Sequence, residues 1–426
     1  MLRQMLDRLR HPESFLGPVL TLVSGTAVAH GITALTLVAL TRLYSPDDFG
    51  ILGLFSGIFY ILAAVACLRF DVAIPLPKEE SDARDIFWLA LGGTFFLAAL
   101  LAILLALIPA EFWVRVNLVA VTPYLWLLPI SIIAVGIFTA LQSWHVRQRS
   151  YVLIAQARVA QSAGASTIQI ASGIAAPSPA GLITGFIVNG GAAALLVLGR
   201  MWRQGTLKRL YPDLSRLPRA FRRYSYYPRY SVWEGVANSA AVQLPILLIG
   251  AYSPKAEVGF LLLALNVVQA PMALFGTATA QVFISQAPEK ARQGKLAGVT
   301  RASAASLAKV GIALLVPIGL LSPVVFPLAF GQEWARAGIL AAWMAPWLIV
   351  QFVASPLSMA LYILERQRLA FGLHLVGLTI RVGMTWAGIL FFQNRGAEAY
   401  ALSGLLFYGM MIFLILHLTG EVAPKP

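Results

Sequence analysis

Long stretches without a charged residue recur along the whole chain. A helix that crosses a membrane needs about 20 consecutive apolar residues, because the hydrocarbon core is about 30 Å thick and each residue rises about 1.5 Å. The uninterrupted runs are 14–41, 49–68, 86–110, 116–146, 159–199, 235–254, 258–288, 310–332, 337–364 and 399–420. One further run of suitable length, near Leu369–Asn394, carries Arg381 at its centre. Since 159–199 can hold two helices broken at Pro177–Ser178–Pro179, we predict an all-α integral membrane protein with about twelve transmembrane helices.

The composition excludes several other classes of protein. Among 426 residues, 59% are hydrophobic and only 12% are charged, whereas soluble domains carry roughly 25% charged residues. The single cysteine, Cys67, excludes an internal disulfide and a cysteine-based metal site. The five histidines are scattered without zinc-ligand spacing, and no phosphate-binding Gly-Lys-Ser/Thr loop is present. The predicted external loops are also short, so we expect no metal, no cofactor and no enzymatic activity.

The basic residues predict the orientation of the chain. Of the 32 Lys and Arg residues, 24 fall on one side of the predicted membrane, 5 on the other, and Arg158, Lys309 and Arg381 lie within spans. Cytoplasmic loops are the ones enriched in Lys and Arg. Both termini are therefore expected in the cytoplasm, with 1–10 lying at the membrane surface as an uncleaved segment. The excess of positive charge then serves topology and attraction to anionic headgroups, and no nucleic acid partner is expected.

Two short motifs occur twice. The segment YSPDDFGILGLF from Tyr44 recurs loosely as YSPKAEVGFLLL from Tyr252, and RQRSYVLIAQARV from Arg147 recurs as RQRLAFGLHLVGL from Arg366. Each pair falls at the same position in a half of six helices, which indicates an internal duplication. Because six is even, both halves enter the membrane from the same side, and the repeat is parallel. We predict six-helix bundles at 1–199 and 231–426.

The segment 200–230 is the predicted cytoplasmic linker between the bundles. It is rich in arginine, and its apolar residues keep rough helical spacing. Pro212 and Pro218 are expected to interrupt that helix. The pattern therefore predicts a broken helix that lies at the membrane surface.

Polar side chains within the spans are the candidate binding residues, because such groups are costly in lipid unless they face a bundle interior or a wet cavity. Stripes of Ser, Thr, Asn and Gln also commonly tie neighbouring helices together, and cations near a helix end can extend to the surface. Arg381 is too deep for that and is expected in a cavity. The candidates from these stripes are His30, Arg158, Asn238, Asn266, Gln269, Lys309, His374 and Arg381.

The spans hold cations but almost no carboxylate beyond Glu234. A wet cavity with this bias favours an anionic substrate, and arginine suits phosphate through two parallel hydrogen bonds. The same bias argues against an antiport mechanism that depends on a deep carboxylate, and against export of cationic drugs.

Two stretches near the N-terminus carry a resemblance. LVALTRLYSPDDFGILGLFSGIF at 37–59 and LRFDVAI at 68–74 resemble the opening of polysaccharide-transporter flippases, in the multidrug/oligosaccharidyl-lipid/polysaccharide exporter superfamily. The resemblance implies a V-shaped transporter and adds Arg42, Arg69 and Asp71 as motif residues. Arg69 and Asp71 could equally pair with each other and cap a helix end.

The resemblance implies a function and a place for it. Such flippases move undecaprenyl-diphosphate-linked oligosaccharides, such as O-antigen or exopolysaccharide units, to the outer leaflet of the bacterial inner membrane. The expected partners are the lipid-diphosphate-linked oligosaccharide, the bilayer, and the polymerase and glycosyltransferases of the same pathway. Relatives acting on the peptidoglycan precursor have two more helices, so that substrate is less favoured. A small-molecule or drug antiporter and a non-transporting partner of a glycan-assembly complex remain as alternatives.

Overall fold

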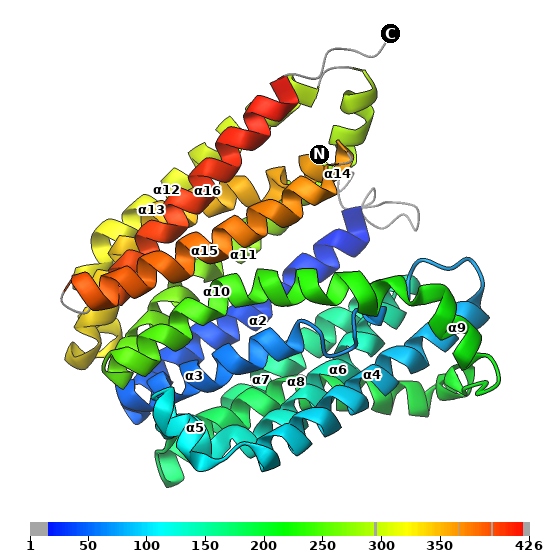
Figure 1. Ribbon diagram of the computed structural model, residues 1–426, viewed down its shortest axis with the longest axis horizontal. Helices are drawn as coiled ribbons and strands as arrows, with labels where there is room; N and C mark the ends of the chain where they lie inside the picture. The colour runs from blue at the N-terminus through cyan, green and yellow to red at the C-terminus, as the bar shows by residue number, and fades with distance from the viewer. Residues whose placement is uncertain (1–15, 294–295, 365, 393–394, 421–426) are drawn as a thin grey trace, which may run out of the picture. The chain divides into compact units, whose positions relative to one another are not determined.

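The computed structural model describes residues 16–293, 296–364, 366–392 and 395–420. Within these ranges the chain is helical and contains no strand (Figure 1). The predicted surface segment 1–10 lies outside the described residues. Helices suit a membrane because they satisfy every backbone hydrogen bond within one segment.

The twelve predicted transmembrane helices are confirmed. Ten segments of the described chain are long and apolar enough to cross a membrane, so the protein is a multi-pass membrane protein. With α7 and α11, the described chain has twelve long helices. The break predicted at 177–179 falls between the end of α7 and the start of α8. The long helices are α2 (Leu16–Leu43), α3 (Pro46–Ala63), α4 (Glu80–Leu107), α6 (Leu128–Arg147), α7 (Tyr151–Ala175), α8 (Pro179–Arg203), α10 (Val232–Tyr252), α11 (Lys255–Arg292), α12 (Leu296–Phe330), α13 (Ala335–Leu357), α15 (Gln367–Phe391) and α16 (Gly396–Gly420).

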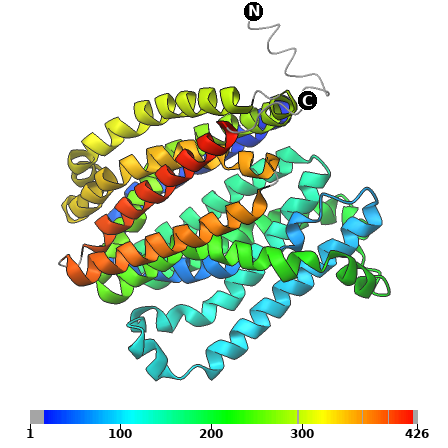
Figure 2. The ribbon, with the colours of Figure 1, turned by 45° about the horizontal axis from the view of Figure 1, so that its top comes forward.

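Short helices connect the long ones. Figure 2 shows α4 leading through α5 before the chain returns as α6. The short elements are η1 (Phe70–Val72), α5 (Ala110–Arg115), η2 (Val119–Leu127), η3 (Thr206–Leu210), α9 (Leu217–Tyr224), η4 (Tyr227–Ser231), η5 (Gln332–Trp334) and α14 (Met359–Ile363).

The predicted linker is a broken helix, but one of its proline assignments was wrong. The break surrounds Pro212, between η3 and α9. Pro218 does not interrupt a helix, because it lies in the first turn of α9. Proline is favoured there, since the first backbone N–H groups of a helix have no partner within the helix and the fixed φ of proline suits the turn.

The chain divides into two compact units. The first comprises 1–43 and 58–236, and the second comprises 44–57 and 237–426. The first unit therefore includes the linker, and the first three turns of α3 belong to the second unit. The predicted boundaries at 199 and 231 stay a prediction.

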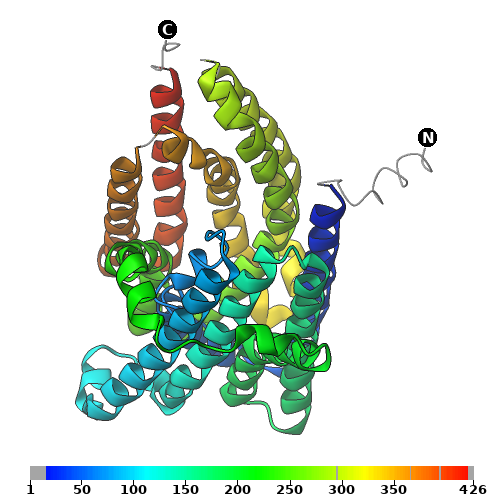
Figure 3. The ribbon, with the colours of Figure 1, turned by 90° about the vertical axis from the view of Figure 1, so that its right-hand side faces the viewer.

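Three helix pairs recur at equivalent positions of the two units. In the first unit α4 packs on α6, α6 on α8, and α7 on α8. In the second unit the equivalent helices pack in the same way: α12 on α13, α13 on α16, and α15 on α16 (Figure 3). Each unit also has its own apolar core, around Phe87 and Trp144 in the first and around Phe352 and Phe407 in the second. This shared pattern supports the internal duplication that the sequence predicted.

The two copies of the YSP motif cross each other in the second unit. A Cβ atom added to Gly50 on α3 would lie 2.1 Å from the carbonyl oxygen of Lys255 on α11. Conversely, a Cβ atom added to Gly259 on α11 would lie 2.0 Å from the carbonyl oxygen of Pro46 on α3. In each motif, the glycine lies one helical turn after the residue whose carbonyl oxygen faces the other glycine: Gly50 follows Pro46, and Gly259 follows Lys255. The contact is therefore reciprocal, and it needs a glycine on both helices.

An aromatic cluster closes the same end of the second unit. The Trp334 side chain is fully buried and packs edge to face against Phe49 at 4.9 Å and Phe260 at 5.9 Å between ring centroids. Phe49 precedes Gly50, and Phe260 follows Gly259. The glycine contact and the aromatic cluster thus form one packed layer where α3, α11 and η5 meet.

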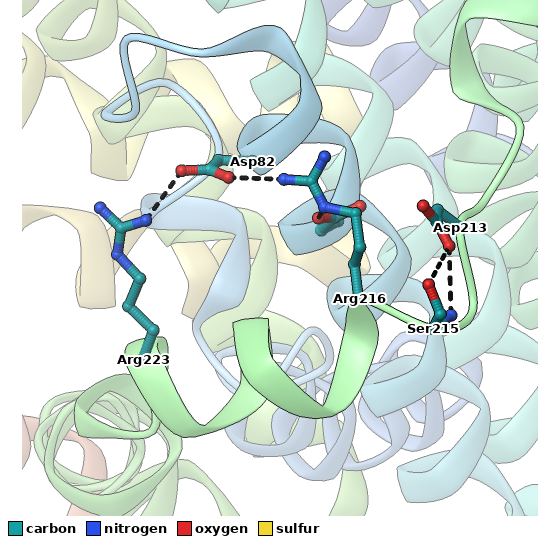
Figure 4. Close-up of polar contacts among 6 residues, drawn as sticks. Asp82, Asp213, Ser215, Arg216 and Arg223 are labelled. Carbon is teal, nitrogen blue, oxygen red and sulfur yellow. Dashed lines mark hydrogen bonds and ion pairs between the residues drawn. The ribbon is translucent and has the colours of Figure 1, made fainter.

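The linker is held to the first unit by ion pairs. Arg216 lies 2.9 Å from Asp82 and 3.0 Å from Asp85, and Arg223 lies 2.9 Å from Asp82 (Figure 4). Asp82 and Asp85 belong to the first two turns of α4, so α9 is tied across the start of that helix. Trp88 adds a hydrogen bond from its indole N–H to the carbonyl oxygen of Leu210.

A local turn precedes α9. The hydroxyl of Ser215 donates to Asp213 at 2.6 Å, and the Ser215 backbone N–H donates to the same oxygen at 3.2 Å (Figure 4). These donors hold the pKa of the Asp213 carboxyl below its usual range. The turn brings Arg216 to the side of α4 on which its acidic partners lie.

Gly50→Ala is expected to destabilise the protein. The added methyl group meets a backbone carbonyl that cannot rotate away, and overpacking of this kind costs about 1–3 kcal/mol. Thermal unfolding of the purified protein in lipid nanodiscs measures the effect. Gly409→Ala on α16 is the matched control, because its added Cβ atom meets open space and alanine is the better helix former. Equal melting temperatures for the two variants would contradict the close contact.

Asp82→Ala is expected to release α9 from α4. It removes the partner of Arg223 and one of the two partners of Arg216, and exposed ion pairs of this kind contribute roughly 0.2–1 kcal/mol each. Trypsin cleavage in 216–223 should therefore accelerate by a few fold in the intact membrane protein. Glu79→Ala changes an exposed carboxylate just before α4 and should leave the cleavage rate unchanged. A rate that rises equally in both variants would show that the ion pairs do not hold the linker.

Candidate functional site

A groove runs between α2 and α7 in the first unit. Its volume is about 350 Å³. At Gly25 an added Cβ atom would lie 2.5 Å from the Cβ atom of Ala155, so the two backbones approach closely along the groove. The lining residues are Ser24, Gly25 and Val28 of α2 with Val152, Ala155, Gln156 and Val159 of α7.

Arg158 of α7 is not one of the residues that line this groove. Its Nη1 atom donates a hydrogen bond to the Thr26 hydroxyl at 3.0 Å, and its side chain is half-buried. Within the described part of the chain, no carboxylate forms an ion pair with Arg158. His30, half-buried one turn further along α2, lies within electrostatic range of the same guanidinium. The structure thus brings together two of the predicted site residues, His30 and Arg158.

Gln156 adds an acceptor that the sequence did not single out. Its side-chain Oε1 atom is buried and meets no hydrogen-bond donor among the described residues. A buried amide oxygen without a donor costs free energy comparable to a lost hydrogen bond. Gln156 and Arg158 are two residues apart on α7, about 200° around the helix, so the acceptor lines the groove and the cation does not.

Beyond Arg158, the polar stripes of α2 and α7 tie these two helices together. The Thr33 hydroxyl donates to Ser162 at 3.3 Å, and the Thr36 hydroxyl donates to Ser166 at 2.7 Å. This arrangement matches the helix-tying interpretation that the sequence left open. Thr36 and Ser166 were not among the predicted stripe residues, because periodicity shows which residues share a face but not which face meets a partner.

Arg69 and Asp71 lie at a strained turn after α3. Leu68 and Arg69 both adopt a left-handed backbone, with φ of 48° and 64°, a conformation that is costly for residues other than glycine. The buried Phe70, Ala73 and Ile74 anchor the turn. Such strain persists only where the surrounding structure enforces it.

The charged groups of this turn do not form a close pair. Among the described residues no ion pair joins Arg69 to Asp71, and the buried Nε atom of Arg69 meets no acceptor. Burial raises the pKa of the Asp71 carboxyl, while the Arg69 guanidinium and backbone N–H groups oppose that rise. The carboxyl therefore serves the local helix end through backbone hydrogen bonds.

Arg381 is enclosed in the second unit. Its side chain is 1% exposed, and its guanidinium carbon lies 4.7 Å from the centre of the Trp347 ring and 4.6 Å from that of Tyr400. Cation–π contacts of desolvated groups contribute about 2 kcal/mol or more. The aromatic residues around Arg381 were not predicted, because nothing in their spacing distinguishes them from ordinary core residues.

An ion cluster that the sequence missed lies elsewhere in the second unit. Arg336 lies 2.6 Å from Glu257 and 2.7 Å from Glu398. The three residues occupy the first turns of α13, α11 and α16, which the predicted topology places at the external ends of those helices. The cluster therefore ties three helix starts together at one end of the unit.

The remaining predicted site residues lie apart from these clusters. Arg42 is exposed in the last turn of α2, where a cation complements the helix dipole. His374 lines a small cavity of about 40 Å³ together with Ser358 and Met411. Asn266 donates to the carbonyl oxygen of Leu262 in its own helix. The exposed members of this group are Arg42, Asn238, Asn266, Gln269 and Lys309, and their binding role stays a prediction.

Known proteins share this fold. A structure described as the lipid II flippase MurJ in an inward closed conformation aligns with a TM-score of 0.71 and 12% identity, covering 94% of this chain and 87% of that one. A multidrug resistance MATE family transporter of the MOP superfamily, in an inward-facing conformation, aligns with a TM-score of 0.66 and 12% identity over 94% of this chain and 98% of that one. Identity this low shows the fold alone.

A third solved structure has a similar fold. The MATE multidrug transporter DinF-BH aligns with a TM-score of 0.64 and 13% identity, covering 95% of this chain and 96% of that one. A search of curated protein sequences gave no significant match.

The family is shown by the sequence. The model of a family described as polysaccharide biosynthesis protein matches residues 39–338. This range includes both copies of the YSP motif, the linker and Arg158. Because the match covers well over half of the chain, the protein belongs to the polysaccharide biosynthesis protein family.

Proposed function

We propose that the protein is a flippase that moves an undecaprenyl-diphosphate-linked oligosaccharide from the cytoplasmic to the outer leaflet of the bacterial inner membrane. Membership of a polysaccharide biosynthesis family and the shared fold with a lipid II flippase support this proposal. The observation that carries it is the half-buried Arg158 of α7, which bonds to the Thr26 hydroxyl of α2 and forms no ion pair with a carboxylate of the described chain.

The chemistry of Arg158 suits a lipid diphosphate. A guanidinium presents parallel N–H donors that match phosphate oxygens, and such charge-assisted bonds are about twice as strong as neutral ones. The Thr26 contact uses Nη1 of Arg158, so other N–H donors remain for an anion. The Gln156 oxygen can accept a hydrogen bond from a sugar hydroxyl. The lipid tail would stay in the bilayer while the head group crosses.

The proposed mechanism is alternating access, in which the two six-helix halves move relative to each other about a central site. Parallel repeats suit a rocking motion of this kind. In this mechanism the protein binds and releases the substrate without making or breaking a covalent bond, so it is not an enzyme. The polymerase and the glycosyltransferases of the pathway would act before and after it, and both termini of the chain would face the cytoplasm.

A drug antiporter is the second candidate, and the shared fold with MATE transporters favours it. The charge of Arg158 argues against a cationic substrate, because no carboxylate of the described chain pairs with it. A non-transporting partner of a glycan-assembly complex is the third candidate. The three candidates differ in what purified protein should move across a membrane.

Arg158→Gln is expected to slow the movement of a fluorescent undecaprenyl-diphosphate sugar across proteoliposomes by about tenfold or more, because a hydrogen bond to a charged group contributes about 1.5–3 kcal/mol. Arg158→Lys should restore part of the rate, since it keeps the charge but loses the planar pair of donors. Quenching of the outward-facing label by dithionite measures the rate.

Controls separate the three candidates. Arg200→Gln, at an exposed position in the last turn of α8, should keep the wild-type rate. Movement of a cationic dye but not of the lipid-linked sugar by the wild-type protein would overturn the flippase in favour of the antiporter. Movement of neither, with loss of surface glycan in a null strain, would favour the non-transporting partner.

A further inference from the structure

Arg381 has an unusual set of neighbours for a buried charge. It lies near the middle of α15, against Trp347 of α13 and Tyr400 of α16, whose rings pack edge to face with centroids 5.1 Å apart. The hydroxyls of Tyr400 and Tyr408 interact with its guanidinium. Since the Tyr400 hydroxyl donates its hydrogen to the carbonyl oxygen of Val242 at 3.1 Å, its lone pairs face the cation.

One edge of the guanidinium has no such acceptor. The Nε and Nη2 atoms of Arg381 are buried, and neither meets a hydrogen-bond acceptor among the described residues. In a planar guanidinium these two atoms lie side by side, and their N–H bonds point in the same direction. One anion can therefore accept hydrogen bonds from both. This is the geometry with which arginine holds an anion. Two adjacent buried donors without an acceptor are rare in folded proteins.

The charge of Arg381 also has no counter-charge within the described part of the second unit. No carboxylate there forms an ion pair with Arg381, and the half-buried Glu257 and the buried Glu398 bind Arg336 instead. An uncompensated charge in a low-dielectric interior costs several kcal/mol even after relaxation. Aromatic rings and hydroxyls offset part of that cost, but they carry no opposite charge.

We propose that the Nε and Nη2 edge of Arg381 binds one small inorganic anion of the halide class, with chloride as its physiological form. The side chain is 1% exposed, which excludes a lipid diphosphate and limits a partner on this edge to a single small ion. The anion would neutralise the guanidinium and join α13, α15 and α16 as a structural part of the second unit. This inference does not depend on the proposed transport function. A water molecule on the same edge would accept hydrogen bonds from the two donors, but it would leave the positive charge of Arg381 uncompensated.

Binding of radioactive chloride to the purified full-length protein tests the proposal. In gluconate buffer of constant ionic strength, the wild-type protein should bind about one chloride per chain, and bromide should displace it. Arg381→Gln should abolish this binding. Arg395→Gln, which removes an exposed arginine of the same unit, should retain it. Binding that survives in Arg381→Gln would overturn the location, and absence of binding to the wild-type protein would overturn the site.

A second measurement on the wild-type protein keeps the test decisive if Arg381→Gln does not fold. Replacing gluconate by chloride should raise the melting temperature by about 3 °C or more, with saturation, as expected for a ligand that binds only the folded state. Bromide should reproduce the rise and sulfate should not. The same melting temperature in chloride, sulfate and gluconate would show that water occupies the edge and would overturn the proposal.

Discussion

The membrane interior offers no water to a charged or polar group, and this constraint explains most of what the structure places inside the helix bundles. The arginines that the fold buries wholly or in part each have a different set of partners. Arg336 holds two glutamates, Arg158 bonds to a threonine hydroxyl, and Arg381 lies among aromatic rings. These partners neutralise the charges of the three arginines to different degrees. Arg336 is paired with two carboxylates and serves the packing of helix ends, whereas Arg158 and Arg381 have no carboxylate partner among the described residues.

The duplication of the chain has a direct structural expression. The two YSP motifs approach so closely that each needs a glycine opposite a carbonyl oxygen of the other. A helix from the first half therefore begins in the second unit and continues into the first. The helix pairs that recur at equivalent positions of the two units also support the duplication. The functional groups, however, are not duplicated: Arg158 has no arginine at the equivalent position of α15, and the enclosed Arg381 has none on α7.

Much of the fold could be predicted because the length and the apolarity of a transmembrane segment are properties of consecutive residues. The helix count, the break at 177–179 and the repeat all follow from such local patterns. Pro218 was misassigned because proline interrupts a helix when it lies in the interior but is favoured when it lies in the first turn. The sequence did not show where the helix starts, so it could not distinguish the two cases. The polar stripes of α2 and α7 showed which side chains share a face. Their hydroxyl pairs became visible only in the packed helices.

The sequence alone determined that this protein crosses a membrane many times, that its halves are related, and that the charges within its predicted spans are mainly positive. Those features depend on residue type and order. The tertiary structure decided which side chains surround each charge, because partners such as Thr26 for Arg158 and Trp347 for Arg381 lie far away along the chain, on other helices. Only the fold brings such groups within hydrogen-bonding or stacking distance, and in a medium without water that proximity decides whether a cation is satisfied or ready to bind an anion.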